Sequence, residues 1–182
     1  MRTRITITTG LMLLLSAVAF GQLRLVPMRY SKVRLVNGKH SVTVDLDEAL
    51  EGSSGTMPGD APHKYRVLFS TKKGDFLYLV VNVQSHSPIS DRNAPCGGDA
   101  PQAILWIRTD KELKAAQFNS QIYASCSYNY HDSKLRVTKT GLKVYYGGRE
   151  KKELTYDNEH PEKGLVLGSL DPGMITNSKP GH

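Results

Sequence analysis

The sequence has few of the residue patterns that usually carry chemistry. Its two cysteines, Cys96 and Cys126, are far apart and form no C-x-x-C pair, and no two of its six histidines are close enough to make an H-x-x-x-H pair. It contains no G-x-S-x-G sequence and no glycine-rich loop followed by Lys-Ser or Lys-Thr. The usual motifs of thiol redox enzymes, zinc sites, serine hydrolases and phosphate-binding loops are therefore absent. We assign no catalytic residue, no metal ligand and no cofactor from the sequence.

Long apolar runs are absent except near the N-terminus. Arg2 and Arg4 precede an apolar segment that is densest over Leu11–Phe20, and small residues surround Ala19. This order of charge, apolar run and small residues predicts a signal peptide over residues 1–21, which a signal peptidase removes. Retention as a membrane anchor is the alternative. The run is shorter than the roughly 20 residues of a spanning helix, which favours cleavage over retention. No later segment approaches that length, so we expect no stable membrane insertion after cleavage.

Export would place the mature chain in a periplasmic or extracellular, oxidising compartment. In that compartment Cys96 and Cys126 are expected to form one disulfide, the alternative being two buried free thiols. Such a bridge would stabilise the fold by about 3–4 kcal/mol. We expect a single domain over residues 22–170 and a flexible tail over residues 171–182, which contains two Pro-Gly pairs.

Alternation of apolar and polar residues dominates the rest of the chain and indicates strands. The segment 32–46 alternates on both sides of Asn37-Gly38, the strongest hairpin turn signal in the sequence. A second hairpin is predicted over residues 64–83, with its turn at residues 72–75. Its second half, Phe76–Val83, is almost continuously apolar, which is typical of a central strand covered on both faces.

Further strands complete an all-β prediction. They are expected at residues 103–107, 135–138, 142–146, 153–156 and 165–167. The segment Asp110–Phe118 reads either as a short helix that Asp110 caps or as a turn into a returning strand, and we favour the strand. Several short strands with regularly spaced turns predict a single antiparallel β-sandwich or a barrel-like domain, without deciding between the two.

One group of residues suggests a binding surface. Tyrosines, lysines and arginines are concentrated between residues 123 and 152, and side chains of these types bury a large area at low entropic cost. The candidate surface consists of Tyr128, Tyr130, Lys134, Arg136, Lys143 and Tyr145. Alternation along a strand predicts that one of the neighbours Tyr145 and Tyr146 points outward. The alternative is that the tyrosines pack the sheet while the cations only solvate its outer face.

These observations favour a secreted or periplasmic, non-enzymatic β-domain that binds an envelope or extracellular partner. The formal net charge of +7, or +5 without residues 1–21, suits an anionic glycan, and a protein partner remains open. We do not expect nucleic acid as a partner. One alternative is a periplasmic inhibitor or immunity protein, although a basic chain suits basic lysozyme-like targets poorly. Others are a cell-wall or glycan hydrolase with a dispersed active site and a purely structural envelope component.

Overall fold

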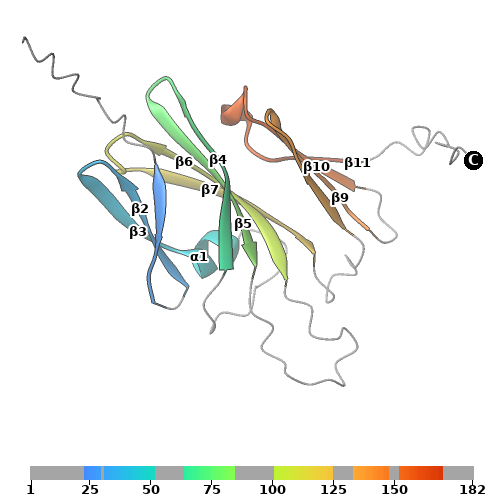
Figure 1. The fold of residues 1–182 in the computed structure, drawn as a ribbon, viewed down its shortest axis with the longest axis horizontal. Coiled ribbons are helices and arrows are strands. Elements are labelled where there is room, and N and C mark those ends of the chain that lie inside the picture. The colour runs from blue at the N-terminus through green and yellow to red at the C-terminus, as the bar shows by residue number, and fades with distance from the viewer. Residues whose placement is uncertain are drawn as a thin grey trace, which may run out of the picture.

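The computed structural model describes residues 23–29, 31–51, 64–84, 101–124, 133–147 and 152–169. The described part is mostly β-structure, and its strands pair antiparallel in three sheets with the orders β1-β2-β3, β4-β5-β6-β7 and β11-β10-β9-β8. Figure 1 shows the four-stranded sheet β4–β7 between the other two. We refer to them as the N-terminal, central and C-terminal sheets.

The N-terminal sheet contains the first predicted hairpin. Strands β2 (Lys32–Asn37) and β3 (His40–Asp45) pair around a turn at which Gly38 has φ 58°, and β1 (Arg24–Pro27), which the sequence pattern did not predict, adds to β2. The hairpin is confirmed, but its second strand ends one residue earlier than expected because Leu46 begins the short helix α1 (Leu46–Glu51).

A side-chain cap explains why the strand gives way to a helix at this point. The Asp45 carboxylate accepts hydrogen bonds from the Ser31 hydroxyl at 2.9 Å and from the Asp47 backbone N–H at 3.1 Å. An aspartate oxygen that accepts a free N–H of the first turn stabilises a helix start. Asp45, Asp47 and Glu48 thus belong to a capped helix N-terminus.

The central sheet consists of the second predicted hairpin and a second pair of strands. Strands β4 (Lys64–Lys73) and β5 (Phe76–Gln84) turn at Gly74, with φ 60°, and β6 (Gln102–Asp110) lies between β5 and β7 (Ala116–Ala124). Both predicted hairpin strands and the buried strand around residues 103–107 are confirmed. Strand β5 is buried along almost its whole length, as its apolar run predicted.

The ambiguous segment after Asp110 is a hairpin turn and not a helix. The Asp110 carboxylate accepts hydrogen bonds from the backbone N–H groups of Glu112 and Lys114, at 2.9 and 3.0 Å. The hydrogen bond from the Lys114 N–H, followed by that from Glu112, lowers the pKa of Asp110. The same aspartate that would cap a helix therefore closes a turn here, because its side chain satisfies the turn's N–H groups. The preference for a returning strand is confirmed.

The C-terminal sheet contains the four remaining predicted strands. They are β8 (Lys134–Val137), β9 (Gly141–Tyr145), β10 (Lys152–Asp157) and β11 (Val166–Ser169), in antiparallel pairs. Between β10 and β11 the chain forms a one-turn 3-10 helix, η2 (Pro161–Lys163), that the sequence pattern did not predict.

Alternate residues of the central strands contribute to two separate cores. Leu79 and Leu105 pack with Leu35 of β2 and the residues of α1, whereas Val80 and Ile104 pack with Leu154 and other residues of the C-terminal sheet. Since successive side chains of a strand point to opposite faces, the N-terminal and C-terminal sheets cover opposite faces of the central sheet (Figure 1).

The predicted all-β, antiparallel class is therefore confirmed. The described strands form three stacked sheets, which differs from the two-sheet sandwich and the barrel that the sequence suggested. The physical reason is that β5 and β6 are apolar on both faces and need a cover on each side. The predictions for the signal peptide, the Cys96–Cys126 disulfide, Tyr128, Tyr130 and the tail 171–182 lie outside the described residues. Within the described part, no helix is long and apolar enough to span a membrane.

Candidate functional site: a polar hollow on the C-terminal sheet

The outer face of the C-terminal sheet brings together the four described members of the predicted binding surface. In the β8–β9 register Lys134 is opposite Tyr145, and Arg136 is opposite Lys143. Directly paired residues share a face of the sheet. The inner face is formed by the alternate residues Leu142 and Val144, which are buried. Lys134, Arg136, Lys143 and Tyr145 thus lie on one surface.

The neighbouring tyrosines of β9 have different environments. Tyr146, just after the strand, is buried in the core beneath the sheet, while Tyr145 is half-buried on the other side. Tyr156 and Tyr123 are also core residues, and burial is the main cause that raises the pKa of each of their hydroxyls. Several tyrosines of this part of the chain therefore pack the sheets, as the structural alternative proposed, and Tyr145 is the described one that stays on the outer face beside the cations.

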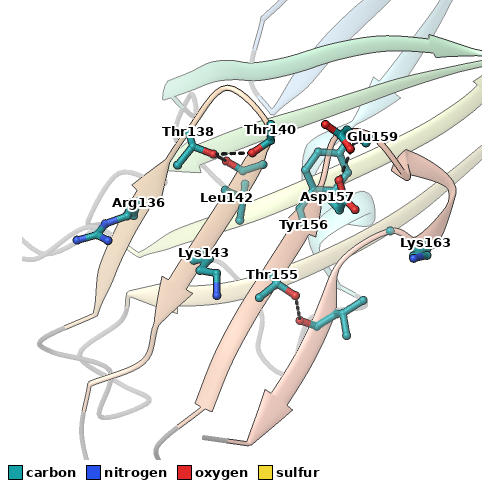
Figure 2. A pocket seen from close by; sticks show the side chains of 13 residues that line it. Arg136, Thr138, Thr140, Leu142, Lys143, Thr155, Tyr156, Asp157, Glu159 and Lys163 are labelled. Carbon is teal, nitrogen blue, oxygen red and sulfur yellow. Dashed lines mark hydrogen bonds between the residues drawn. The ribbon is translucent and has the colours of Figure 1, made fainter. Parts of the chain in front are cut away.

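A hollow of about 550 Å³ opens along this face. Figure 2 shows it between the β8–β9 turn and the chain that leads from β10 into η2. Its charged lining residues are Arg136, Lys143, Asp157, Glu159 and Lys163, and its hydroxyl-bearing lining residues are Thr138, Thr140, Thr155 and Tyr156. Arg136 and Lys143 come from the predicted surface. The other charged and hydroxyl-bearing lining residues were missed because they come from turns, from β10 and from η2, where no local pattern distinguishes a lining residue from any other polar one.

The cations of the hollow differ in how they are held. The Lys143 ammonium is 2.9 Å from the Glu153 carboxylate, whose side chain is only 16% exposed, and the hydrogen bond to this carboxylate raises the pKa of Lys143. The side chains of Arg136 and Lys163 have no hydrogen-bond or ion-pair partner among the residues that the structure describes. The guanidinium of Arg136, which has no described partner, is therefore available to bind an anion from the solvent through its N–H groups.

The carboxylates of Asp157 and Glu159 lie across the hollow from Arg136, on the same side as Lys163 (Figure 2). Asp157 contacts the His160 ring nitrogen Nδ1 at 2.8 Å and accepts the Glu159 backbone N–H at 2.9 Å. These contacts, the first of them foremost, lower the pKa of Asp157, so this carboxyl group is ionised at neutral pH. Within the described residues, no cluster of three or more His, Cys, Asp or Glu side chains has the arrangement of a metal site.

The turn that closes one end of the hollow depends on a close backbone contact. Gly141 is opposite Asp157 in the β9–β10 register, and a Cβ atom at position 141 would overlap the carbonyl oxygen of Tyr156. The Thr138 backbone N–H and hydroxyl both donate to the Gly141 carbonyl, at 2.9 and 3.1 Å. Glycine thus lets the β8–β9 turn approach β10, and this approach sets the hydroxyls of Thr138 and Thr140 at the rim (Figure 2).

Comparisons with known proteins found no matching family model, no matching curated protein and no matching solved structure. The functional argument therefore rests on the geometry of the site.

Proposed function

We propose that this protein is a secreted, non-enzymatic β-domain that binds an anionic glycan on the outer face of its C-terminal sheet. The observation that carries the proposal is the unpartnered guanidinium of Arg136 at the hollow, with Lys134 and Lys143 beside it on the same face. Arginine binds carboxylate and sulfate groups with two parallel hydrogen bonds, which gives both affinity and orientation.

The remaining lining groups suit a hydroxylated ligand. Threonine hydroxyls both donate and accept, and the carboxylates of Asp157 and Glu159 accept hydrogen bonds from sugar hydroxyls. The half-buried ring of Tyr145 lies opposite Lys134 in the register, where it offers a flat apolar surface to a sugar ring. A ligand that has both negative charges and free hydroxyls would use the cationic and the acidic sides of the hollow together.

The hydrolase alternative is less well supported by the same residues. Glycoside cleavage needs a carboxylic acid that remains protonated near neutral pH as a proton donor. Asp157 instead favours the ionised form, because its contacts with His160 and with the Glu159 N–H lower its pKa. An inhibitor or immunity protein would use the same outer face against a protein, and it remains the second reading.

Binding to defined polymers tests the proposal. We expect the protein to bind polygalacturonate, a uronate polymer, and not neutral dextran. Arg136→Gln should weaken binding by about tenfold or more, since hydrogen bonds to charged groups contribute roughly 1.5–3 kcal/mol. Lys64→Gln, which removes an exposed cation from the edge of the central sheet, is the control and should leave the affinity unchanged. Isothermal titration calorimetry provides the affinities.

Two outcomes would contradict the glycan proposal. Equal affinity for polygalacturonate and dextran would show that binding does not require negative charge on the polymer. An equal loss of affinity in Arg136→Gln and Lys64→Gln would show that the hollow is not the binding site. A supporting variant is Glu153→Gln, which releases the Lys143 ammonium from its carboxylate and should increase affinity for the polyanion.

The proposed export is tested separately by intact-mass measurement. The protein recovered from the periplasm or medium should lack its first 19 or 21 residues and weigh two hydrogens less than its reduced form, because Cys96 and Cys126 would be joined. A chain that retains Met1 in the exported fraction, or that remains in the cytosol with both thiols reduced, would contradict secretion.

A further inference from the structure

The outer face of the N-terminal sheet is a second basic surface, and the glycan proposal does not use it. In the registers of this sheet Val26 is opposite Arg34 and Arg34 is opposite Thr43, so these three side chains form one row across the outer face. Arg24 is opposite Val36, one row away. The alternate residues of the same strands, such as Leu35, are in the core.

The cations of this face are exposed, and of them Lys32 has a carboxylate, that of Asp45, opposite it in the β2–β3 register. Arg24, Lys32 and Arg34 lie on the strands of this face and Arg29 follows β1, and none of these four side chains has a hydrogen-bond or ion-pair partner among the described residues. The carboxylate described on this face, Asp45, is engaged by the Ser31 hydroxyl and the Asp47 N–H at the start of α1. We call the surface formed by these four cations, Val26 and Met28 the N-terminal basic face.

Two apolar side chains are exposed among these cations. Val26 is 43% exposed and Met28 is 38% exposed, and the Thr43 hydroxyl lies 3.8 Å from the Met28 sulfur, which places Met28 over the outer face. Cations that surround exposed apolar groups match the interface of an anionic bilayer, where headgroups meet acyl chains.

We propose that the N-terminal basic face lies against an anionic lipid surface. The position of the face in the chain agrees with this, since Arg24 follows the apolar segment Leu11–Phe20 by only a few residues. Cleavage after residue 21 would add a positively charged α-amino group beside β1. Retention of the segment would hold the face next to the bilayer. Nucleic acid fits less well, because the rows across β1–β3 offer Val26 and Met28 but no aromatic side chain on which a base would stack.

The arrangement of the sheets determines where the hollow points when the N-terminal basic face lies on lipid. The N-terminal and C-terminal sheets cover opposite faces of the central sheet, so their outer surfaces point away from each other (Figure 1). A molecule that lies on lipid through the N-terminal basic face would present Arg136 and the hollow to the surrounding medium.

Vesicle binding tests the inference. The protein is purified from its own cell, so that any natural processing of the N-terminus has taken place. The ratio of partition onto phosphatidylglycerol-containing vesicles to partition onto pure phosphatidylcholine vesicles is measured at low salt. The double variant Arg24→Gln/Arg34→Gln should lower this ratio about 25-fold, at about fivefold per basic residue near an anionic surface. The matched control Lys64→Gln/Arg66→Gln removes the same charge from the exposed edge of β4 and should leave the ratio almost unchanged.

A third variant tests the apolar contact. Val26→Ser/Met28→Ser keeps every charge and should lower binding to the anionic vesicles, whereas a purely long-range attraction would leave it unchanged. Near-ultraviolet circular dichroism checks that each variant is folded.

The inference is overturned by a ratio close to one in the unaltered protein. It is also overturned by equal losses in the two charge variants, or by tighter binding to duplex nucleic acid than to anionic vesicles at the same salt. Because Arg136→Gln leaves this face intact, failure of the glycan proposal and failure of the lipid proposal are separate results.

Discussion

Individual residues of this protein have their effect mainly at turns, where one side chain or its absence sets the path of the chain. Asp45 starts a helix and Asp110 closes a hairpin, each through carboxylate contacts with backbone N–H groups. Gly141 acts through the absence of a side chain, because the carbonyl of Tyr156 occupies the space that a Cβ atom would need.

Gly141→Ala is therefore expected to destabilise the fold by about 3 kcal/mol, the upper part of the range for inserting an atom into a packed site. The added methyl group would meet backbone and not a flexible side chain, so β9 and β10 would have to separate. Chemical denaturation measures the loss in the free energy of unfolding.

Gly168→Ala is the control for this prediction. Gly168 lies in β11 of the same sheet, and an added Cβ would make only an ordinary contact, 3.9 Å from the Glu153 carbonyl oxygen. We expect its effect to stay within about 0.5 kcal/mol. Similar losses in the two variants would show that the close approach at Gly141 is not what constrains this turn.

Among the elements, the segment from Asp157 to Lys163 connects two layers. The Trp106 indole N–H donates to the Pro161 carbonyl at 3.0 Å, and the Lys73 ammonium contacts both the Glu159 carbonyl at 3.0 Å and the Glu162 carboxylate at 2.9 Å. These contacts hold η2 against the central sheet. Because Asp157 and Glu159 also line the hollow, the same contacts position its acidic side.

This attachment predicts a loss of stability in acid. The hydrogen bond from Lys73 is the main cause that lowers the pKa of Glu162, and the contact with His160 has the same role for Asp157. A carboxyl group whose pKa is lower in the folded state stabilises the fold above its unfolded pKa, and this contribution disappears as the pH falls through the folded pKa. The free energy of unfolding should therefore decrease as the pH is lowered below about 5, where these carboxyl groups begin to protonate in the unfolded chain.

Glu162→Gln should make this decrease shallower, because it removes one of the responsible carboxyl groups. Urea denaturation at a series of pH values between 3 and 7 measures the slope. Glu48→Gln is the matched control, since Glu48 is an exposed carboxylate on α1 without a described ion pair. An unchanged slope in Glu162→Gln, or the same change in both variants, would contradict the role assigned to the Lys73 contact.

At the scale of the whole molecule, the two cores share the central sheet as a common wall. Leu79 and Val80 are neighbours in β5, yet the first packs toward the N-terminal sheet and the second toward the C-terminal sheet. We therefore expect the described layers to unfold together, because loss of β5 would remove one side of each core.

Leu35→Ala tests this cooperativity. Leu35 is fully buried in the core on the N-terminal side, and its truncation should cost about 2–5 kcal/mol. Trp106, the single tryptophan of the chain, is in the other core. Its fluorescence midpoint in denaturant should fall together with the far-ultraviolet circular dichroism midpoint. A fluorescence midpoint that stays in place while the dichroism changes would show that the layers unfold separately.

The sequence by itself determined the local β-structure. Alternation at 32–37 and 40–45, the turn residues at Asn37-Gly38 and Lys73-Gly74, and the two-sided apolar run of β5 were sufficient to predict both hairpins and the buried central strand. These features depend on neighbours along the chain, for which period-2 alternation and turn chemistry are direct physical signals.

Only the tertiary structure decided which strands share a sheet and which polar residues meet. The joining of β1 to the first hairpin, the three-layer order and the meeting of Arg136 with Asp157, Glu159 and Lys163 in one hollow all depend on pairing between distant segments. Alternation predicts that a strand has a buried face, but it does not predict which other sheet or helix packs against that face. Arg136 was therefore predictable as an outward cation, whereas its position beside the carboxylates of β10 and the following turn was not.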